Sequence, residues 1–116
     1  MKLLTAAIIN KLLKAPIYST DAKDVSPIIV KFFTPWSNWT WYAVEGSPVK
    51  DETGAIIDWE FFGLVEGHER ELGNFVLSEL QSIKGRYGLK IERDMHFDNM
   101  ELVKSTKTVR KIAVLR

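Results

Sequence analysis

Hydrophobic residues recur near the start of the chain at the spacing of an amphipathic helix. The apolar stripe consists of Ile8, Ile9, Leu12 and Leu13. Thr5 is a candidate N-cap and Pro16 a stop signal, so the pattern predicts a helix from about Ala6 to Lys14. Polar residues interrupt the apolar run after about eight residues and no small-residue cleavage site follows, which argues against a secretion signal. We therefore expect a docked helix and a cytoplasmic protein.

Strand-like patterns follow a polar connection. Residues 27–33, PIIVKFF, are β-branched and aromatic, and predict a largely buried strand. Pro35 occupies the second position of a turn that leads into a second strand, residues 38–44. Side chains alternate in this strand, so Trp39 and Trp41 share one face and Tyr42 lies on the other. Residues 45–54, EGSPVKDETG, predict a polar loop.

The next segments continue the same alternation of strands and turns. Residues 55–67, AIIDWEFFGLVEG, predict a long third strand, and residues 74–77, NFVL, a fourth. Ser78 and Gln81 match a capping box, which predicts a short helix from Glu79 to Lys84 with Gly85 at its end.

The C-terminal third has weaker patterns. Residues 89–97, LKIERDMHF, predict an extended segment, and residues 108–116, TVRKIAVLR, favour a strand by their β-branched content.

Together these elements predict an α+β fold. We expect one globular domain over residues 1–116, with an antiparallel meander of about four strands, an N-terminal helix and a short helix after the fourth strand. A parallel sheet is disfavoured, because the turns between the central strands are too short to contain crossover helices.

Composition narrows the class of protein. The chain is 46% hydrophobic and 27% charged, which is typical of a globular protein rather than a disordered or membrane-spanning one. It contains no cysteine, which excludes disulfides, thiolate metal sites and cysteine nucleophiles. No phosphate-binding glycine loop, nucleophile elbow or zinc-helix motif is present, so we expect no cofactor and favour a non-enzymatic protein.

Charge is unevenly distributed although the net charge is only +1. Eight acids and two bases lie between Glu45 and Glu71, and Asp51 and Glu52 form the centre of the acidic loop. After Glu101 there are only bases, namely Lys104, Lys107, Arg110, Lys111 and Arg116. Such a tail suits either a nucleic-acid-binding arm or a solvated strand, and the sparse spacing favours the solvated strand.

The segment RDMHFD contains the best candidate for a chemical site. If residues 94–98 are extended, Asp94, His96 and Asp98 share one face, about 6.5 Å apart between neighbours. Carboxylate and imidazole donors suit a divalent metal or acid–base chemistry. The simpler interpretation is an edge strand with polar residues outward and its carboxylates paired with nearby bases, and this is the one we favour.

Three tryptophans lie within six residues at 36–41. Nucleic-acid stacking platforms normally combine exposed aromatic residues with lysine and arginine, and no base lies between Phe32 and Glu45. Burial of a tryptophan stabilises a small domain strongly, so we assign Trp39 and Trp41 to the core. Trp36 lies on the Pro35 turn and is the candidate contact residue of the cluster.

Several blocks of the chain occur in an order that resembles a known bacterial family. The blocks are VKFFTPWSNWTWYAVEG, FFGLVEGHERELGNFVLSELQSIKGRYGLKIERDMHF and IYSTD, and they resemble the family called domain of unknown function 2958 over about residues 1–97. The chain departs from the family at GNFVL, where an aromatic residue and then a serine are expected. Its tail, residues 98–116, matches nothing in the resemblance.

The resemblance carries no assigned activity. Its members are similar in size and often encoded on plasmids and other mobile elements, which implies an accessory or host-interaction role. We therefore expect a protein partner, such as host defence or DNA-processing machinery, bound through Trp36, Asp51 and Glu52, or the basic tail. Two alternatives stay open: a metal-dependent hydrolase or nuclease using Asp94, His96 and Asp98, and a nucleic-acid binder using Lys107, Arg110 and Lys111.

Overall fold

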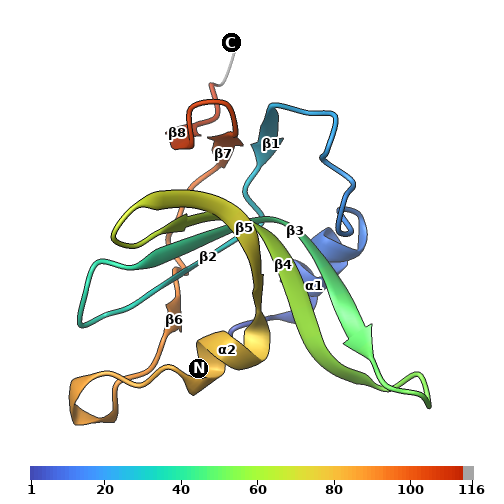
Figure 1. The fold of residues 1–116 in the computed structure, drawn as a ribbon, viewed down its shortest axis with the longest axis vertical. Helices are drawn as coiled ribbons and strands as arrows, with labels where there is room; N and C mark the ends of the chain where they lie inside the picture. Colours follow the sequence, from blue (N-terminus) through green and yellow to red (C-terminus); the bar gives the residue numbers. More distant parts are fainter. Residues whose placement is uncertain (114–116) are drawn as a thin grey trace.

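The computed structural model describes residues 1–113, which form two antiparallel sheets and two α-helices (Figure 1). The helices are α1 (Ala6–Leu13), α2 (Leu77–Ser82) and the 3-10 helix η1 (Arg86–Gly88). The strands are β1 (Val25–Pro27), β2 (Val30–Phe33), β3 (Thr40–Lys50), β4 (Ile56–Glu66), β5 (Arg70–Val76), β6 (Glu92–Arg93), β7 (Met100–Val103) and β8 (Thr108–Lys111). The predicted α+β class is confirmed. The prediction of about four strands is too low, because the described residues form eight.

The larger sheet has the strand order β5-β4-β3-β2-β6, with antiparallel neighbours throughout. Its longest strands, β3 and β4, form a ribbon whose turn projects from the body of the protein (Figure 1). The predicted loop at 45–54 is wrong at its first six positions, because residues 45–50 continue β3 and pair with β4. The polar sequence of residues 45–50 predicted a loop. The strand continues there because the Glu45 side chain is buried and hydrogen-bonded, and Gly46 packs against Leu12.

The smaller sheet has the order β1-β7-β8. The single strand predicted at residues 27–33 is divided between the two sheets. Pro27 belongs to β1 in the smaller sheet, whereas β2 lies in the larger one. The chain changes sheets between Ile28, whose N–H donates to the Met100 carbonyl at 2.9 Å, and Ile29, whose N–H donates to the Ala43 carbonyl at 2.8 Å. Ile28 is buried in the smaller sheet's cluster and Val30 in the other cluster, so the continuous apolar sequence does not reveal the change.

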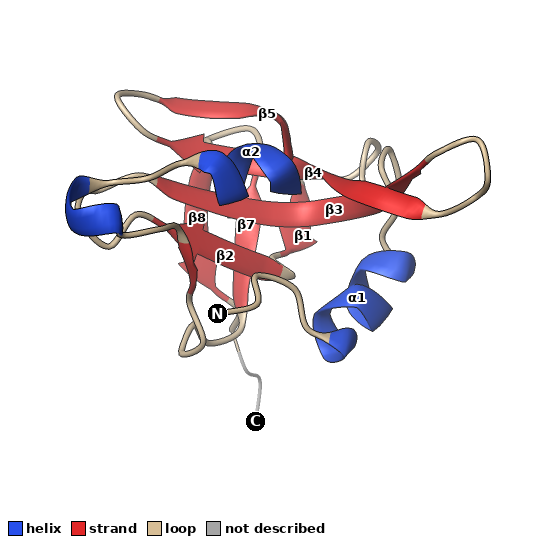
Figure 2. Cartoon of the chain, turned by 90° about the horizontal axis from the view of Figure 1, so that it is seen from below, coloured by secondary structure: helices blue, strands red, loops and turns tan. Residues whose placement is uncertain are grey.

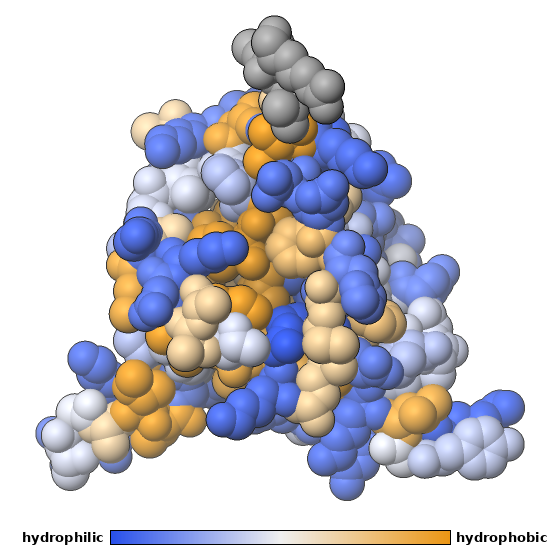
Figure 3. Space-filling view, turned by 180° about the vertical axis from the view of Figure 1, so that it is seen from behind, coloured by the Kyte–Doolittle hydropathy of each residue, from blue (hydrophilic) through white to orange (hydrophobic). Residues whose placement is uncertain are grey.

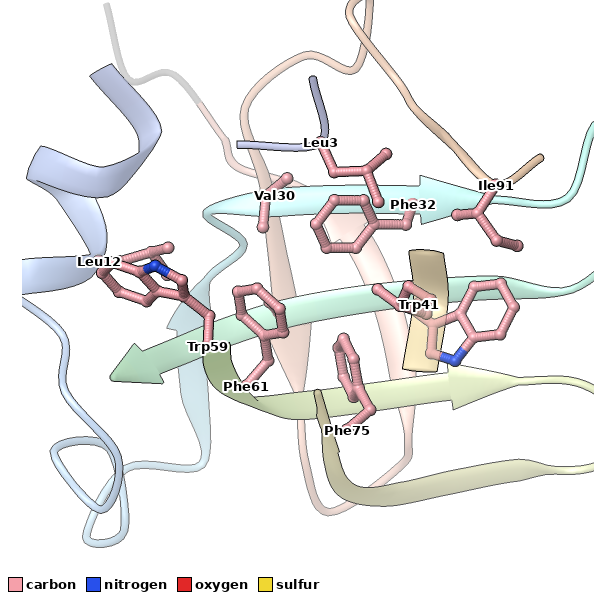
Figure 4. Packing of buried hydrophobic residues seen from close by; sticks show 11 residues of the cluster. Leu3, Leu12, Val30, Phe32, Trp41, Trp59, Phe61, Phe75 and Ile91 are labelled. Carbon is pink, nitrogen blue, oxygen red and sulfur yellow. The ribbon is translucent and has the colours of Figure 1, made fainter. Parts of the chain in front are cut away.

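Hydrophobic side chains pack on both faces of the larger sheet. One cluster, drawn in Figure 4, lies between the sheet and both helices and includes Leu3, Leu12, Val30, Phe32, Trp41, Trp59, Phe61, Phe75, Leu80 and Ile91. The other cluster joins the two sheets through Ile28, Tyr42, Val44, Leu64 and Leu102. Trp41 is buried, Trp39 is half-buried against the first cluster, and Tyr42 lies in the second, so the predicted faces of this strand are confirmed.

The bounds and N-cap of the first helix agree with the prediction, but Leu13 of its predicted apolar stripe is 57% exposed. The second helix differs from its prediction. The Thr5 hydroxyl accepts the Ile8 N–H at 3.2 Å, and α1 ends within one residue of the prediction. The Ser78 hydroxyl, by contrast, donates to Asp58 of β4 at 2.5 Å, and α2 begins at Leu77. Asp58 also accepts the Ser78 N–H at 3.0 Å, so a carboxylate from the sheet replaces the predicted capping box. Within residues 1–113, no helix has the length and apolar character needed to cross a membrane.

Candidate functional site

A surface groove of about 620 Å³ lies between α1 and the segment that follows β6. Its apolar lining comes from residues far apart in the chain, including Ile8, Ile28, Ile29, Phe97, Met100 and Ile112. Figure 2 shows α1 and α2 in front of the larger sheet and the smaller sheet behind it. The face of the protein opposite to the view of Figure 1 exposes hydrophobic residues at its centre and hydrophilic residues around them (Figure 3). The groove therefore combines an apolar interior with a polar border.

The border of the groove carries more positive than negative charge. Lys11 of α1, Lys14 directly after α1 and Arg93 of β6 line it, and none of the three forms an ion pair within residues 1–113. The Arg93 guanidinium donates to the Lys2 carbonyl, which fixes its position and leaves its charge without a carboxylate partner. A ligand with negative charge and an apolar side would be complementary to this border.

The predicted face of Asp94, His96 and Asp98 does not form. β6 ends at Arg93, and residues 94–98 bend instead of extending. Asp94 accepts the His96 N–H at 2.8 Å and pairs with Lys31 at 3.2 Å, whereas Asp98 accepts the Asn99 N–H at 2.8 Å. Partial burial favours a higher pKa for Asp94, but the His96 N–H and Lys31 outweigh it and hold that pKa below its ordinary value.

In the described part of the chain, this segment therefore provides few groups for catalysis or metal binding. Asp94 and Asp98 line the groove, and His96 is exposed outside its lining. No group of three or more histidine, aspartate or glutamate side chains suited to a metal ion occurs within residues 1–113. The edge-strand alternative was right about the pairing of Asp94 with a base and wrong about the extended backbone.

Trp36 does not stand free on its turn. It is half-buried against the first hydrophobic cluster, and its ring lies directly on the backbone of Gly85. A β-carbon added to Gly85 would lie only 2.1 Å from Trp36 Cδ2, so a glycine is needed for this contact. Trp36 thus joins the β2–β3 turn to the loop after α2.

Asp51 and Glu52 lie on the projecting turn between β3 and β4. The Asp51 carboxylate closes this turn by accepting the Thr53 N–H at 2.8 Å, the Thr53 hydroxyl at 2.6 Å and the Ala55 N–H at 3.1 Å. The hydrogen bond from the Thr53 hydroxyl is the main cause that lowers the pKa of Asp51. Asp51 therefore has a structural role in the turn, and Glu52 stays exposed beside it.

The basic tail folds back as the β7–β8 hairpin up to residue 111. Arg110 forms an ion pair with Glu101 at 2.8 Å, and Lys107 occupies the hairpin turn with φ +51°. Lys111 is exposed on β8, whereas Lys104 points into the protein and bonds to Thr20. Arg116 lies outside the described residues. Within the described residues, the predicted binding residues of the tail are thus spread over a hairpin, and Arg110 is already paired with an acid.

A buried carboxylate joins the two sheets, and sequence reasoning missed it. Glu45 is 1% exposed and accepts the Tyr18 N–H at 2.9 Å, the Thr20 N–H at 2.7 Å and the Thr20 hydroxyl. Lys104, in the turn between β7 and β8 of the smaller sheet, donates to the same hydroxyl at 2.9 Å. The only signal in the sequence was the position of Glu45 directly after the alternating segment WYAV.

The sequence matches the family described as protein of unknown function, DUF2958, over residues 3–111. The chain belongs to this family, as the resemblance predicted. The match includes β7 and β8 and so extends past residue 97, where the resemblance ended. A search of curated proteins and a search of solved structures each gave no match.

Proposed function

We propose that this member of the family is a non-enzymatic accessory protein that binds an acidic, amphipathic segment of a partner protein in the groove beside α1. The observation that carries this proposal is the combination of an apolar interior with three cations that have no carboxylate partner. Apolar side chains of the partner would enter the groove, and its acids would face Lys11, Lys14 and Arg93.

The charged groups of the groove argue against a catalytic role. A cavity of about 620 Å³ has the dimensions of a binding site. Its carboxylates are already engaged, since Asp94 pairs with Lys31 and Asp98 bonds to its neighbouring backbone. Neither is set beside a nucleophile or a convergent metal ligand in the described chain.

The biological setting of the proposal comes from the family. The sequence resembles a group often encoded on plasmids and other mobile elements. We therefore propose that this protein is encoded on such an element and acts in the bacterial cytoplasm. Host defence or DNA-processing machinery is the partner class that this setting suggests.

The proposal is tested by photo-crosslinking in the native host. A photoreactive amino acid at Met95, which lines the groove and is 61% exposed, should crosslink to an acidic segment of one partner protein. The matched control carries the same amino acid at Glu52, on the exposed turn between β3 and β4. Mass spectrometry of the adducts identifies the segment that touches each position.

Charge reversal then separates specific from incidental contact. The Met95 crosslink should disappear in a Lys11→Glu/Lys14→Glu variant that keeps its thermal stability, because glutamates at these two exposed positions would repel the acidic segment. A crosslink that forms at Glu52 and not at Met95, or that survives the reversal, would place the interaction elsewhere.

A further inference from the structure

The loop between α2 and β6, residues 84–90, projects from the body of the protein and carries a tyrosine at its tip. Its sequence is KGRYGLK, and η1 forms the tip. Figure 1 and Figure 2 both show η1 extending well beyond the sheets. Tyr87 is 92% exposed, so its ring is available to a ligand and has no packing role in the described fold.

The backbone of Tyr87 is held in a conformation that tyrosine rarely adopts. Its φ is +61°, in the left-handed region where glycine and asparagine are favoured. Tyr18 also has positive φ, +76°, but its N–H donates to buried Glu45, which accounts for that conformation. The positive φ of Tyr87 and of Gly88 (+73°) belongs to a tight turn that the Leu89 N–H closes on the Arg86 carbonyl at 3.3 Å. The turn explains the backbone but does not require an aromatic side chain, and the exposed ring is left available for a contact outside the chain.

The loop is also strongly positive. Lys84, Arg86 and Lys90 are all exposed, and no acid occurs between residues 80 and 91. None of these three bases forms an ion pair within residues 1–113. An aromatic ring therefore lies on the same short loop as three cations, a combination found in sites that bind single-stranded nucleic acid.

The base of the loop is fixed in place. Lys84 and Lys90 form an isolated antiparallel bridge, and the Gly85 N–H donates to the Leu89 carbonyl at 2.7 Å. The ring of Trp36 lies against Gly85 from the other side. Because the loop is already ordered, binding to its tip would cost less conformational entropy than binding to a flexible loop.

We propose that loop 84–90 binds single-stranded nucleic acid. The ring of Tyr87 stacks on one base, while Lys84, Arg86 and Lys90 contact the flanking phosphates. A single strand fits because it offers both a flat apolar face and a chain of negative charges, whereas a duplex keeps its base faces covered. Trp36 is a positioning residue in this site. The site lies apart from the groove and is independent of the function proposed above.

Fluorescence anisotropy with a labelled oligothymidylate of about 12 nucleotides tests the proposal, with a duplex of the same length as comparison. The wild-type protein should bind the single strand at low salt and more tightly than the duplex. Tyr87→Ala should weaken binding at least about fivefold, and Tyr87→Phe should retain it. A variant with glutamine at Lys84, Arg86 and Lys90 should reduce the slope of log K against log salt by about 2.

Tyr18→Ala is the matched control, because Tyr18 is also exposed and also has positive φ. It should bind the oligonucleotide like the wild type. The circular dichroism spectrum of every variant should match that of the wild type. Absence of binding by the wild type, equal losses for Tyr18→Ala and Tyr87→Ala, or wild-type affinity of Tyr87→Ala would each overturn the proposal. So would competition by polyglutamate as effective as that by unlabelled oligonucleotide, since it would point to an acidic protein as the ligand.

Discussion

Substitution of Glu45 by alanine should be among the most damaging single changes outside the hydrophobic core. Glu45 is 1% exposed on β3 and accepts two backbone N–H groups and the Thr20 hydroxyl. Lys104 donates to that same hydroxyl and, at 2.5 Å, to the Thr20 carbonyl. Alanine would thus remove the acceptor that holds the loop after α1 and the smaller sheet against β3.

The expected cost follows from the number of donors left without a partner. A buried donor that loses its acceptor costs about 1–3 kcal/mol, and removing one member of a buried charged network costs about 3–5 kcal/mol. We expect Glu45→Ala to lower the free energy of unfolding by about 3–5 kcal/mol, a large part of the roughly 5–15 kcal/mol of a typical domain. Glu45→Gln keeps the volume and one acceptor oxygen, so it should cost about half as much.

Urea unfolding followed by tryptophan fluorescence measures both values. The control is Glu52→Ala, which removes an exposed acid from the same ribbon and should change stability by less than about 0.5 kcal/mol. If Glu45→Ala loses less than about 1 kcal/mol, the network around Thr20 does not stabilise the fold as its geometry indicates.

Two further changes test other contacts. Because the folded-state pKa of Asp94 is depressed, the stability it contributes is present above about pH 4 and is lost as the pH falls. Asp94→Asn should therefore flatten the acid side of the curve of stability against pH, and parallel curves for variant and wild type would refute this. Gly85→Ala places a β-carbon against Trp36 and should destabilise by about 1–3 kcal/mol in thermal unfolding. A smaller loss in a Trp36→Ala background is expected if the clash is the cause, and an equal loss would exclude it.

Local periodicity predicted the position of α1 and the division of Trp41 and Tyr42 between the two faces of β3, because residue spacing alone decides which side chains share a face. The change of sheets at Ile28 and Ile29 was not predictable, since buried residues on both sides make one continuous apolar run. The extension of β3 past Glu45 was hidden because a polar side chain is read as exposed unless its partners are known.

The candidate site was harder to predict because it depends on tertiary contacts. The groove brings α1 together with residues 93–100, and no local pattern connects segments so far apart. The bend after Arg93 separates Asp94 from the face that an extended strand would share with His96. Trp36 was correctly placed on a turn, but its contact with Gly85 was not visible from the sequence around it.

Binding of an acidic amphipathic segment in the groove beside α1 is tested most directly by calorimetric titration. The ligand is the partner segment crosslinked at Met95, made as a peptide, and the proteins are the wild type and Lys11→Glu/Lys14→Glu. Loss of two exposed attractions, with repulsion in their place, should cost about 2 kcal/mol, or about 30-fold in affinity. A peptide with lysines in place of its acids should restore binding to the variant. Equal affinity of the acidic peptide for both proteins would contradict the proposed interface.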